Sequence, residues 1–288
     1  LFKDFELKSI NKNEIIKTIT SSGTSNSDLS KIFLDRLTAT NQTKVLTKIV
    51  SSVLGNKRLP MIIIDTEESI ANRNFFSARG AAIKGFSIFG NEIIFALDKN
   101  LRIKYDVIKK FCKKHNNEKI FVFGFTFIIF KNFIDKLLKT KKFLPLSKSV
   151  LIHGGGWKKL IDESVTNNKF KNLIKKTTGI KRVYNYYGMV EQTGSILLEC
   201  DKGNLHSSIY SDVIIRNNDF SECKIGQKGL VQLISVIPQS YPGHVILSED
   251  IGELLGEDNC KCGLKGKYFK IHGRVKNAEI RGCSDAYE

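Results

Sequence analysis

Hydrophobic residues follow two different patterns along this chain. In the first two thirds, short continuous apolar runs alternate with longer stretches in which apolar residues recur three and four positions apart. The runs predict buried strands, and the stretches predict amphipathic helices with Lys facing solvent. Together they favour an α/β layer on a largely parallel sheet. We predict strands at 61–64, 93–97, 120–125, 149–153 and 182–184, and helices at 104–115, 127–138 and 157–176.

The periodicity changes after Gly194. Short apolar runs now follow one another with Gly- and Asn-rich turns between them and no helical stretch. This pattern is typical of an antiparallel subdomain. We predict its strands at 195–199, 213–216, 230–236, 245–247 and 268–271.

The start of the chain gives a weaker pattern. Residues 1–18 mix apolar and charged positions and fit a strand or the end of a helix, and 29–37 shows helix-like periodicity. Between them, 20–27 is a run of hydroxylated residues around Gly23. Such a turn, followed by a helix, can wrap phosphate oxygens, although a solvated flexible loop has the same composition.

Two predicted strands end in unusual chemistry. The strand at 149–153 runs into Gly154, Gly155 and Gly156, which leave bare backbone where a ligand can approach. The next strand leads into 184–194, which combines three Tyr rings with Gly188 and Glu191. Ligands bind at the carboxyl ends of parallel strands, so these two strand ends predict a nucleotide site. A half-buried aromatic turn is the alternative for the second segment.

The net charge of +17 at pH 7 does not by itself indicate nucleic-acid binding, because Lys residues recur on several predicted helices instead of gathering on one segment. An anionic substrate or an acidic partner is favoured. The longest apolar stretch, 120–130, is too short to span a bilayer, and the first residues lack the pattern of a signal peptide. We therefore expect no membrane span and a cytoplasmic protein. The missing initiator Met leaves amino-terminal truncation open.

The six cysteines predict thiol or metal chemistry more than a disulfide framework. Cys260 and Cys262 are one residue apart and cannot complete a tetrahedral zinc site alone. Cys200 and His206 are the predicted further ligands of a structural Cys3His site; reduced, partly buried thiols are the alternative. Three other residues, Cys112, Cys223 and His153, are interpreted as structural.

Taken in order, these motifs resemble those of the acyl-adenylate-forming enzymes, and among them the bacterial acyl-protein synthetases of the luciferase fatty-acid reductase system. The resemblance covers about residues 20–283. It rests on Thr20-Ser21-Ser22-Gly23-Thr24-Ser25, Ser30-Lys31-Ile32-Phe33-Leu34-Asp35, His153-Gly154-Gly155-Gly156-Trp157-Lys158, Asn185-Tyr186-Tyr187-Gly188-Met189-Val190-Glu191, Gly273-Arg274 and Ile280-Arg281-Gly282-Cys283.

The resemblance implies a role for each matching position. The phosphates of ATP would lie in the hydroxyl loop, adenine beside the Gly triplet, the ribose hydroxyls on Asp250, Mg2+ on Glu191, and ribose or phosphate on Arg274. Cys283 would accept the acyl group. The implied ATP-binding residues are Ser21, Ser22, Gly23, Thr24, Ser25, Gly154, Gly155, Gly156, Tyr186, Tyr187, Gly188, Glu191, Asp250 and Arg274, and the implied catalytic residues are Thr24, Glu191, Arg274 and Cys283.

The implied fold is the large α/β domain of that superfamily, with mixed and parallel sheets, an antiparallel β subdomain, and the mobile carboxyl-terminal domain absent or vestigial. Residues 1–194 would form the ATP-binding core, 195–272 the antiparallel subdomain and 273–288 a hinge-like tail. The implied reaction is ATP- and Mg2+-dependent activation of a carboxylic acid, a fatty acid in this family, and acyl transfer to a partner protein, either a reductase or an acyl carrier.

Two alternatives remain open from the sequence. In the first, the acyl group is transferred to coenzyme A or another small thiol. In the second the chain is a catalytically weakened nucleotide- or carboxylate-binding module, because Asn26 and Val190 depart from the motifs of the superfamily.

Overall fold

The computed structural model describes residues 2–21, 29–70, 76–156 and 165–275, and its chain forms two compact units. The units are interleaved in sequence. The antiparallel unit comprises Leu1–Thr20, Asp28–Ser52 and Tyr186–Ile280. The α/β unit comprises Ser21–Ser27, Val53–Asn185 and Arg281–Glu288. The division into three consecutive segments at 194 and 272 stays a prediction.

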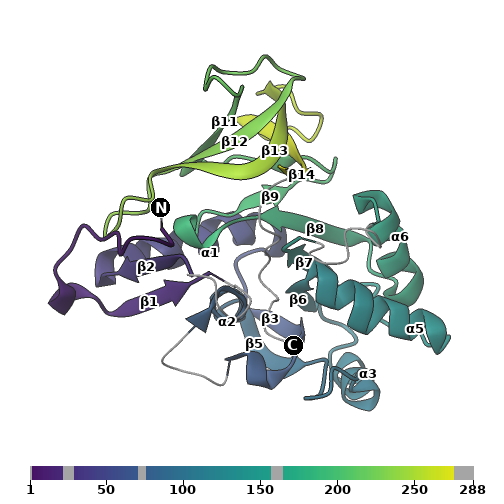
Figure 1. Cartoon of the computed structure of the whole chain (residues 1–288). Coiled ribbons are helices and arrows are strands. Elements are labelled where there is room, and N and C mark those ends of the chain that lie inside the picture. The colour runs from purple at the N-terminus through teal and green to yellow at the C-terminus, as the bar shows by residue number, and fades with distance from the viewer. Residues whose placement is uncertain (1, 22–28, 71–75, 157–164, 276–288) are drawn as a thin grey trace. The chain divides into compact units, whose positions relative to one another are not determined.

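A parallel sheet forms the centre of the α/β unit. Its strands follow the order β8, β7, β6, β3, β5 (Figure 1), and β3 pairs in parallel with both β5 and β6. The apolar runs that predicted these strands are buried along nearly their whole length in β3, β6 and β7, as expected where layers cover both faces. The strands of this sheet are β3 (Leu59–Ile64), β5 (Gly90–Phe95), β6 (Phe121–Phe125), β7 (Val150–Gly154) and β8 (Arg182–Tyr187). The short β4 (Phe76–Ser77) belongs to a separate, three-stranded sheet.

Helices pack an aliphatic and aromatic core against this sheet. Phe111 of α3, Phe133 and Phe170 of α6 are buried in one cluster with strand residues such as Val122 and Leu151. Helix α6 begins where Thr166 accepts a hydrogen bond from the Lys169 N–H and ends at Gly179, whose φ of 78° is left-handed. The helical segments are η2 (Glu67–Ile70), α2 (Ala78–Ser87), α3 (Tyr105–Lys114), α4 (Thr126–Ile128), the π-helical η3 (Ile129–Ile134), α5 (Asp135–Lys139) and α6 (Asn167–Thr178).

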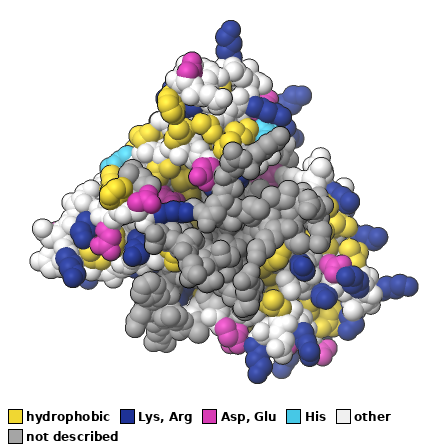
Figure 2. Space-filling view, in the orientation of Figure 1, with side chains coloured by type: hydrophobic (Ala, Val, Ile, Leu, Met, Phe, Trp, Pro, Cys, Tyr) yellow, Lys and Arg dark blue, Asp and Glu magenta, His cyan; other side chains and the backbone are white. Residues whose placement is uncertain are grey.

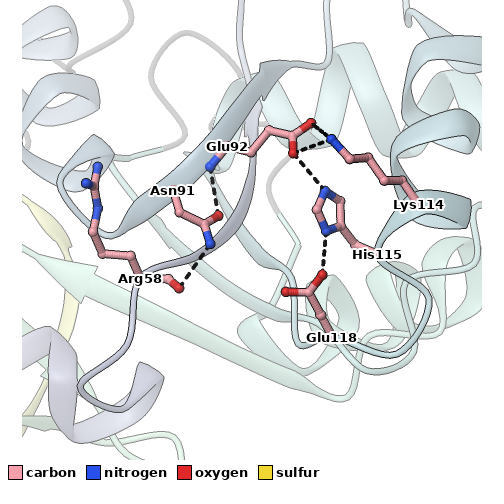
Figure 3. A network of polar contacts seen from close by, with 6 residues as sticks. All are labelled: Arg58, Asn91, Glu92, Lys114, His115 and Glu118. Carbon is pink, nitrogen blue, oxygen red and sulfur yellow. Dashed lines mark hydrogen bonds and ion pairs between the residues drawn. The ribbon is translucent and has the colours of Figure 1, made fainter.

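A polar network ties edge strand β5 to the end of α3 (Figure 3). Lys114 Nζ lies 2.6 Å from one oxygen of Glu92, and His115 bridges Glu92 and Glu118 at 3.2 and 2.7 Å. The hydrogen bond from Lys114 is the largest cause that lowers the pKa of Glu92. These contacts occupy the carboxylates of an exposed sheet edge, so we assign them a structural role.

In the antiparallel unit the strand order is β11, β12, β13, β14, β10, β9 and the end of β8, and these strands pair antiparallel. Buried and half-buried residues alternate along much of β11 and β12, as expected for a sheet with one solvated face. Val213, Val231, Leu254 and Phe269 belong to its small core. The strands are β9 (Leu197–Glu199), β10 (Leu205–His206), β11 (Ser211–Arg216), β12 (Lys228–Ser235), β13 (Val245–Glu257) and β14 (Lys267–Arg274).

The beginning of the chain belongs to the antiparallel unit and differs from its predicted structure. The helix expected at 29–37 is wrong: β2 (Lys31–Leu34) pairs with β1 (Lys17–Thr20), and the helix α1 begins only at Arg36 and ends at Leu54. A short 3-10 segment, η1 (Lys12–Glu14), precedes β1. Pairing overrides local periodicity here because Ile32, Phe33 and Leu34 are all buried.

Apart from this segment, the predicted strands and helices that fall on described residues are present, with shifted ends. The helix expected at 157–176 begins at Asn167 among the described residues, and 157–164 lies outside them. In the part of the chain that the structure describes, no helix is long and apolar enough to cross a membrane. Figure 2 shows Lys and Arg side chains dispersed over the visible face, with apolar and acidic side chains between them.

Candidate functional site

The aromatic stretch at 184–187 lies in strand β8 rather than in a turn. Tyr186 and Tyr187 pair with Leu198 and Leu197 of β9, which makes their backbone part of the antiparallel sheet. Tyr186 is only 8% exposed, whereas Tyr187 is half-buried. Alternation along the strand therefore gives the two rings different surroundings, and Tyr187 is the more accessible.

Tyr187, Asp250 and Arg274 are linked by a series of polar contacts. Its hydroxyl donates to Asp250 Oδ2 at 2.5 Å, and Arg274 Nε lies 3.4 Å from Asp250 Oδ1. Asp250 and Arg274 are opposite each other in the pairing of β13 with β14. Burial, and next the charge of Asp250, raise the pKa of Tyr187 well above its usual value, so the phenol stays protonated and donates.

Sequence reasoning did not identify Glu249 as a member of this group. Its carboxylate lies 2.7 Å from Arg274 Nη2, closer than that of Asp250, and its side chain is 54% exposed. The signal was present in the adjacent acids Glu249 and Asp250. On an extended strand two consecutive side chains point to opposite faces, so Arg274 at the strand end reaches both only because it is long.

Glu191 lies in a short 3-10 segment, η5 (Val190–Gln192), whose backbone is held from several sides. The Gln192 amide donates to the carbonyl of Gly243 at 2.9 Å. A Cβ on Gly243 would come within 2.6 Å of the Glu191 carbonyl, and a Cβ on Gly194 (φ 91°) within 2.7 Å of the Gln42 Cα of helix α1. These close approaches require glycine and fix the path of the segment that carries the Glu191 carboxylate.

In the α/β unit, the predicted Gly triplet follows β7. Gly154 is the last residue of the strand, Gly155 has a φ of 79°, and a Cβ on Gly156 would meet nothing within 4 Å. His153 before them is buried, with Nδ1 2.9 Å from the Thr126 hydroxyl and its ring packed on Phe170. Burial lowers the pKa of His153 to about 3, which keeps the imidazole neutral. The open space at Gly156 leaves backbone accessible.

Several predicted site residues lie outside the described residues. These are Ser22, Gly23, Thr24, Ser25 and Cys283. Ser21 is described and follows strand β1. The roles of all six stay predictions.

The predicted zinc ligands are brought together. The ligand atoms of Cys200, His206, Cys260 and Cys262 all lie within 4.8 Å of one another. Cys200 follows strand β9 and His206 lies in β10, whereas Cys260 and Cys262 lie in the connection between β13 and β14.

The solved structures that the chain resembles include adenylate-forming ligases. The chain superimposes with a TM-score of 0.59 on ATP-bound MatB from Rhodopseudomonas palustris, at 12% identity and covering 92% of this chain and 49% of that one. For a 2-hydroxyisobutyryl-CoA ligase in complex with 2-HIB-AMP and CoA, the TM-score is 0.67 at 12% identity, covering 93% and 55%.

A luciferase-like enzyme from the nonluminescent mealworm Zophobas morio gives a TM-score of 0.57 at 15% identity, covering 94% of this chain and 60% of that one. The chain thus spans about half the length of the solved structures that it matches. At these identities the likeness shows the fold: an α/β fold with a mixed parallel and antiparallel sheet, as the sequence predicted.

A search of the curated proteins finds no match to the chain. The family model described as "Acyl-protein synthetase, LuxE" matches residues 1–288. This match agrees with the fold of the solved neighbours and with the order of motifs in the sequence. The chain belongs to the LuxE acyl-protein synthetase family.

Proposed function

We propose that this protein uses ATP to activate a carboxylic acid, of the fatty-acid class, and transfers the acyl group to a protein thiol. The observation that carries the proposal is the chain of contacts Tyr187–Asp250–Arg274 in a member of the LuxE family. It presents a carboxylate that is fixed in position but still partly accessible, with a side-chain exposure of 19%.

Asp250 is suited to hold the ribose of ATP. A carboxylate accepts hydrogen bonds from two neighbouring hydroxyls, and charge-assisted bonds of this kind are the stronger ones. The Tyr187 hydroxyl occupies Oδ2 and so orients the group, while Oδ1 faces Arg274 at the longer distance of 3.4 Å. Arg274 is the cation of this group and would meet the ribose or the phosphates.

Glu191 would be the protein ligand of Mg2+. The donor set fits, because Mg2+ is bound in such sites by one or two carboxylates together with substrate phosphates. The held backbone of η5 limits the positions that the Glu191 carboxylate can take. When bound, Mg2+ neutralises charge on the phosphates.

The chemistry requires no protein nucleophile in its first step. An oxygen of the acid's carboxylate forms a bond to the α-phosphorus of ATP while the bond from that phosphorus to the bridging oxygen breaks. Pyrophosphate leaves with that oxygen, and the acyl-adenylate remains. The protein contributes by positioning the reactants and neutralising charge. We assign this role to the hydroxyl loop 20–25, which includes Thr24, and to the backbone of Gly154–Gly156.

In the second step a thiolate attacks the acyl carbon, the bond to AMP breaks and a thioester forms. We assign the thiol to Cys283 by its place in the sequence, with a reductase or acyl carrier as the protein that receives the acyl group next. Coenzyme A or another small thiol is the competing acceptor.

One observation favours a second candidate function, a binding module with weakened catalysis. Val190 replaces a hydroxyl residue of the superfamily motif, and its side chain is only 9% exposed. The nearby Thr193 hydroxyl is used locally, since it donates to the Val190 carbonyl at 2.7 Å. Neither residue therefore supplies the replaced hydroxyl.

The test is carboxylate-dependent exchange of labelled pyrophosphate into ATP, with a panel of fatty, aromatic and hydroxy acids. We expect exchange with at least one fatty acid, and Glu191→Gln to lower its rate by roughly two orders of magnitude, as for loss of one electrostatic contact to the transition state. Glu68→Gln is the matched control, because Glu68 is an exposed carboxylate on another 3-10 segment, η2.

Absence of exchange with every acid, in a folded protein that still binds ATP, would favour the binding module. Where exchange occurs, a labelled acid identifies the acceptor. Label on the wild-type protein that is lost in Cys283→Ser supports the protein thioester, and label on added coenzyme A supports the small-thiol alternative.

A further inference from the structure

We propose that Cys200, His206, Cys260 and Cys262 form a closed structural zinc site that fastens the tip of the β13–β14 hairpin to the turn between β9 and β10. The sequence made these residues candidates, and their geometry now allows the site to be specified. Its role does not depend on the proposed function.

The separations within the cluster approach those of a tetrahedral site. Zinc bonds of about 2.3 Å to sulfur and about 2.0 Å to nitrogen place neighbouring ligand atoms roughly 3.4 to 3.8 Å apart. Cys262 Sγ already lies 3.4 Å from His206 Nε2, and every ligand atom is within 4.8 Å of the others. Rotations of the Cys side chains that move the sulfurs by less than about 1 Å would close the site.

Two tight turns position the thiols. In the first, Cys200 exchanges backbone bonds with the end of its own turn, from Gly203 N–H to the Cys200 carbonyl at 3.0 Å and from Cys200 N–H to the Asn204 carbonyl at 2.9 Å. In the second, the Gly263 N–H donates to the Cys260 carbonyl at 3.0 Å. Gly203 and Gly263 have left-handed φ values of 81° and 86°, which bend each turn back toward its first cysteine.

Two of the sulfurs receive contacts from N–H groups. The Leu264 N–H points at Cys262 Sγ at 3.4 Å, and the Asn204 amide at Cys260 Sγ at 3.6 Å. Donors of this kind orient ligands and stabilise negative charge on sulfur in metal sites. The Asn204 contact also joins the two turns: the first turn contributes one sulfur and donates a hydrogen bond to one of the two sulfurs of the second.

His206 is held with one nitrogen directed at the cluster. It lies in β10, where it pairs with Tyr268 of β14, and the two rings stack at 5.6 Å with an angle of 21°. Its Nε2 faces Cys262, while Nδ1 is buried and has no hydrogen-bond partner among the described residues. Zinc on Nε2 would replace this contact with a metal bond, and Nδ1 would then carry the ring proton.

Four protein ligands leave no open position, and three of the four side chains are buried. Both features are typical of structural rather than catalytic zinc. The five cysteines that the structure describes are free thiols, so the three cysteines of this cluster form no disulfide.

The site's location indicates what it stabilises. Cys260 and Cys262 lie in the connection of a hairpin whose other end carries Asp250 opposite Arg274. The pairing of β13 with β14 is irregular at two places, between Ile251 and Gly252 and between Leu254 and Gly256. Irregular pairing weakens the definition of register, and a metal at the hairpin tip would restore it.

The test begins with the metal content of the wild-type protein, purified without chelator and analysed by inductively coupled plasma mass spectrometry. We expect about one zinc per chain, as one Cys3His site holds one ion. Cys262→Ser should retain less than half of the wild-type zinc, and Cys112→Ser and Cys223→Ser, which change buried thiols outside the cluster, should retain it fully.

Cys262→His keeps the proposal testable if Cys262→Ser fails to fold. It should bind zinc, and its cobalt-substituted form should show a tetrahedral spectrum with weaker sulfur-to-metal charge transfer than the wild-type protein. Hydrogen exchange supplies a readout independent of activity: removal of zinc should speed exchange in β13 and β14 and leave β3 and β6 unchanged.

Three results would overturn the proposal. The first is less than half an equivalent of zinc in wild-type protein that was incubated with equimolar zinc and desalted. The second is undiminished zinc in folded Cys262→Ser. The third is iron, or a disulfide within the cluster, in freshly purified protein. None of these results bears on pyrophosphate exchange, so failure here is distinguishable from failure of the proposed function.

Discussion

Each unit contains an Asp–Arg pair beside a strand, and the two pairs differ in almost every respect. In the α/β unit, Asp65 and Arg79 are 0% and 1% exposed, and two Arg79 nitrogens, Nε and Nη2, contact the carboxylate. In the antiparallel unit, Asp250 is partly exposed and its Arg274 contact is 3.4 Å long. The first pair is sealed and serves the fold. The second has a longer contact and a partly exposed carboxylate, and it is the pair to which we assign a ligand in the proposed function.

The surrounding units explain the difference. Strand β3 is buried along five of its six residues, and Asp65 directly follows it, so a charge there must be fully compensated within the protein. Asp65 also accepts from the Thr66 N–H at 2.6 Å and from the Ser69 hydroxyl at 2.5 Å. Strand β13 has one solvated face, where a carboxylate keeps part of its hydration and remains available.

The largest expected effect comes from breaking the sealed pair. Asp65→Asn leaves the Arg79 guanidinium buried without a counter-charge, and removal of one partner of a buried pair costs about 3–5 kcal/mol of unfolding free energy. Denaturant unfolding, with hydrogen exchange to assign the loss to the α/β unit, measures it. Asp106→Asn, on the exposed start of α3, is the control and should change stability by less than about 0.5 kcal/mol. A loss below about 1 kcal/mol for Asp65→Asn would mean that the pair is not sealed.

The open pair should respond in the opposite way. Asp250→Asn should alter unfolding free energy by less than about 1 kcal/mol, since partly exposed ion pairs contribute little. If Asp250 holds the ribose, loss of charge-assisted hydrogen bonds should raise the KM for ATP roughly tenfold or more, equivalent to about 1.5–3 kcal/mol. Pyrophosphate exchange at varied ATP concentrations measures this change.

Asp212→Asn is the matched control for Asp250→Asn. Asp212 lies in the same unit, pairs with Lys267 at 2.9 Å, and is not one of the predicted nucleotide residues. An equal rise in KM for both variants, or a large loss of stability in Asp250→Asn, would remove the distinction between a sealed and an open pair.

The sequence identified both members of the open pair as candidates but did not identify the partner of Asp65. Asp250 and Arg274 belong to motifs that can be recognised by their order along the chain. Apolar runs such as 61–64 and 120–125 clearly predict the buried strands. The partner of Asp65 is on helix α2, which starts with Ala, Arg and Gly and shows no clear apolar period, so neither the helix nor the ion pair was predicted. Local patterns do not reveal which distant charge a buried carboxylate will meet.

The same limit applies at the beginning of the chain. Helix α1 is rich in Thr, Asn, Gln and Ser, and its apolar stripe is correspondingly weak. It is held from outside by contacts at long sequence separation: the Ser240 N–H donates to the Thr38 hydroxyl at 3.2 Å, and the Ser240 hydroxyl donates to the Phe33 carbonyl at 2.7 Å. These contacts join segments about two hundred residues apart and leave no trace in either segment alone.

The smallest of the three effects is the pH dependence of stability that arises from the buried His153 of the α/β unit. Burial, and next the charge of Lys171, lower the pKa of His153 from its ordinary value of 6.5 to about 3. A lowered histidine pKa contributes stability that is fully present above pH 6.5 and is lost as the pH falls from 6.5 toward 3, because the unfolded chain then binds a proton that the folded chain does not.

His153→Gln isolates this contribution, since glutamine stays neutral and retains polar groups for the Thr126 hydroxyl. The stability advantage of wild-type protein over His153→Gln should shrink by roughly 1.4 kcal/mol between pH 7.5 and 5.5, the free energy of about one pH unit below the unfolded-state pKa. Urea unfolding of both proteins at the two pH values measures it. A difference that does not change with pH would show that solvent reaches His153, and that the surroundings of His153 are as open as those of Asp250.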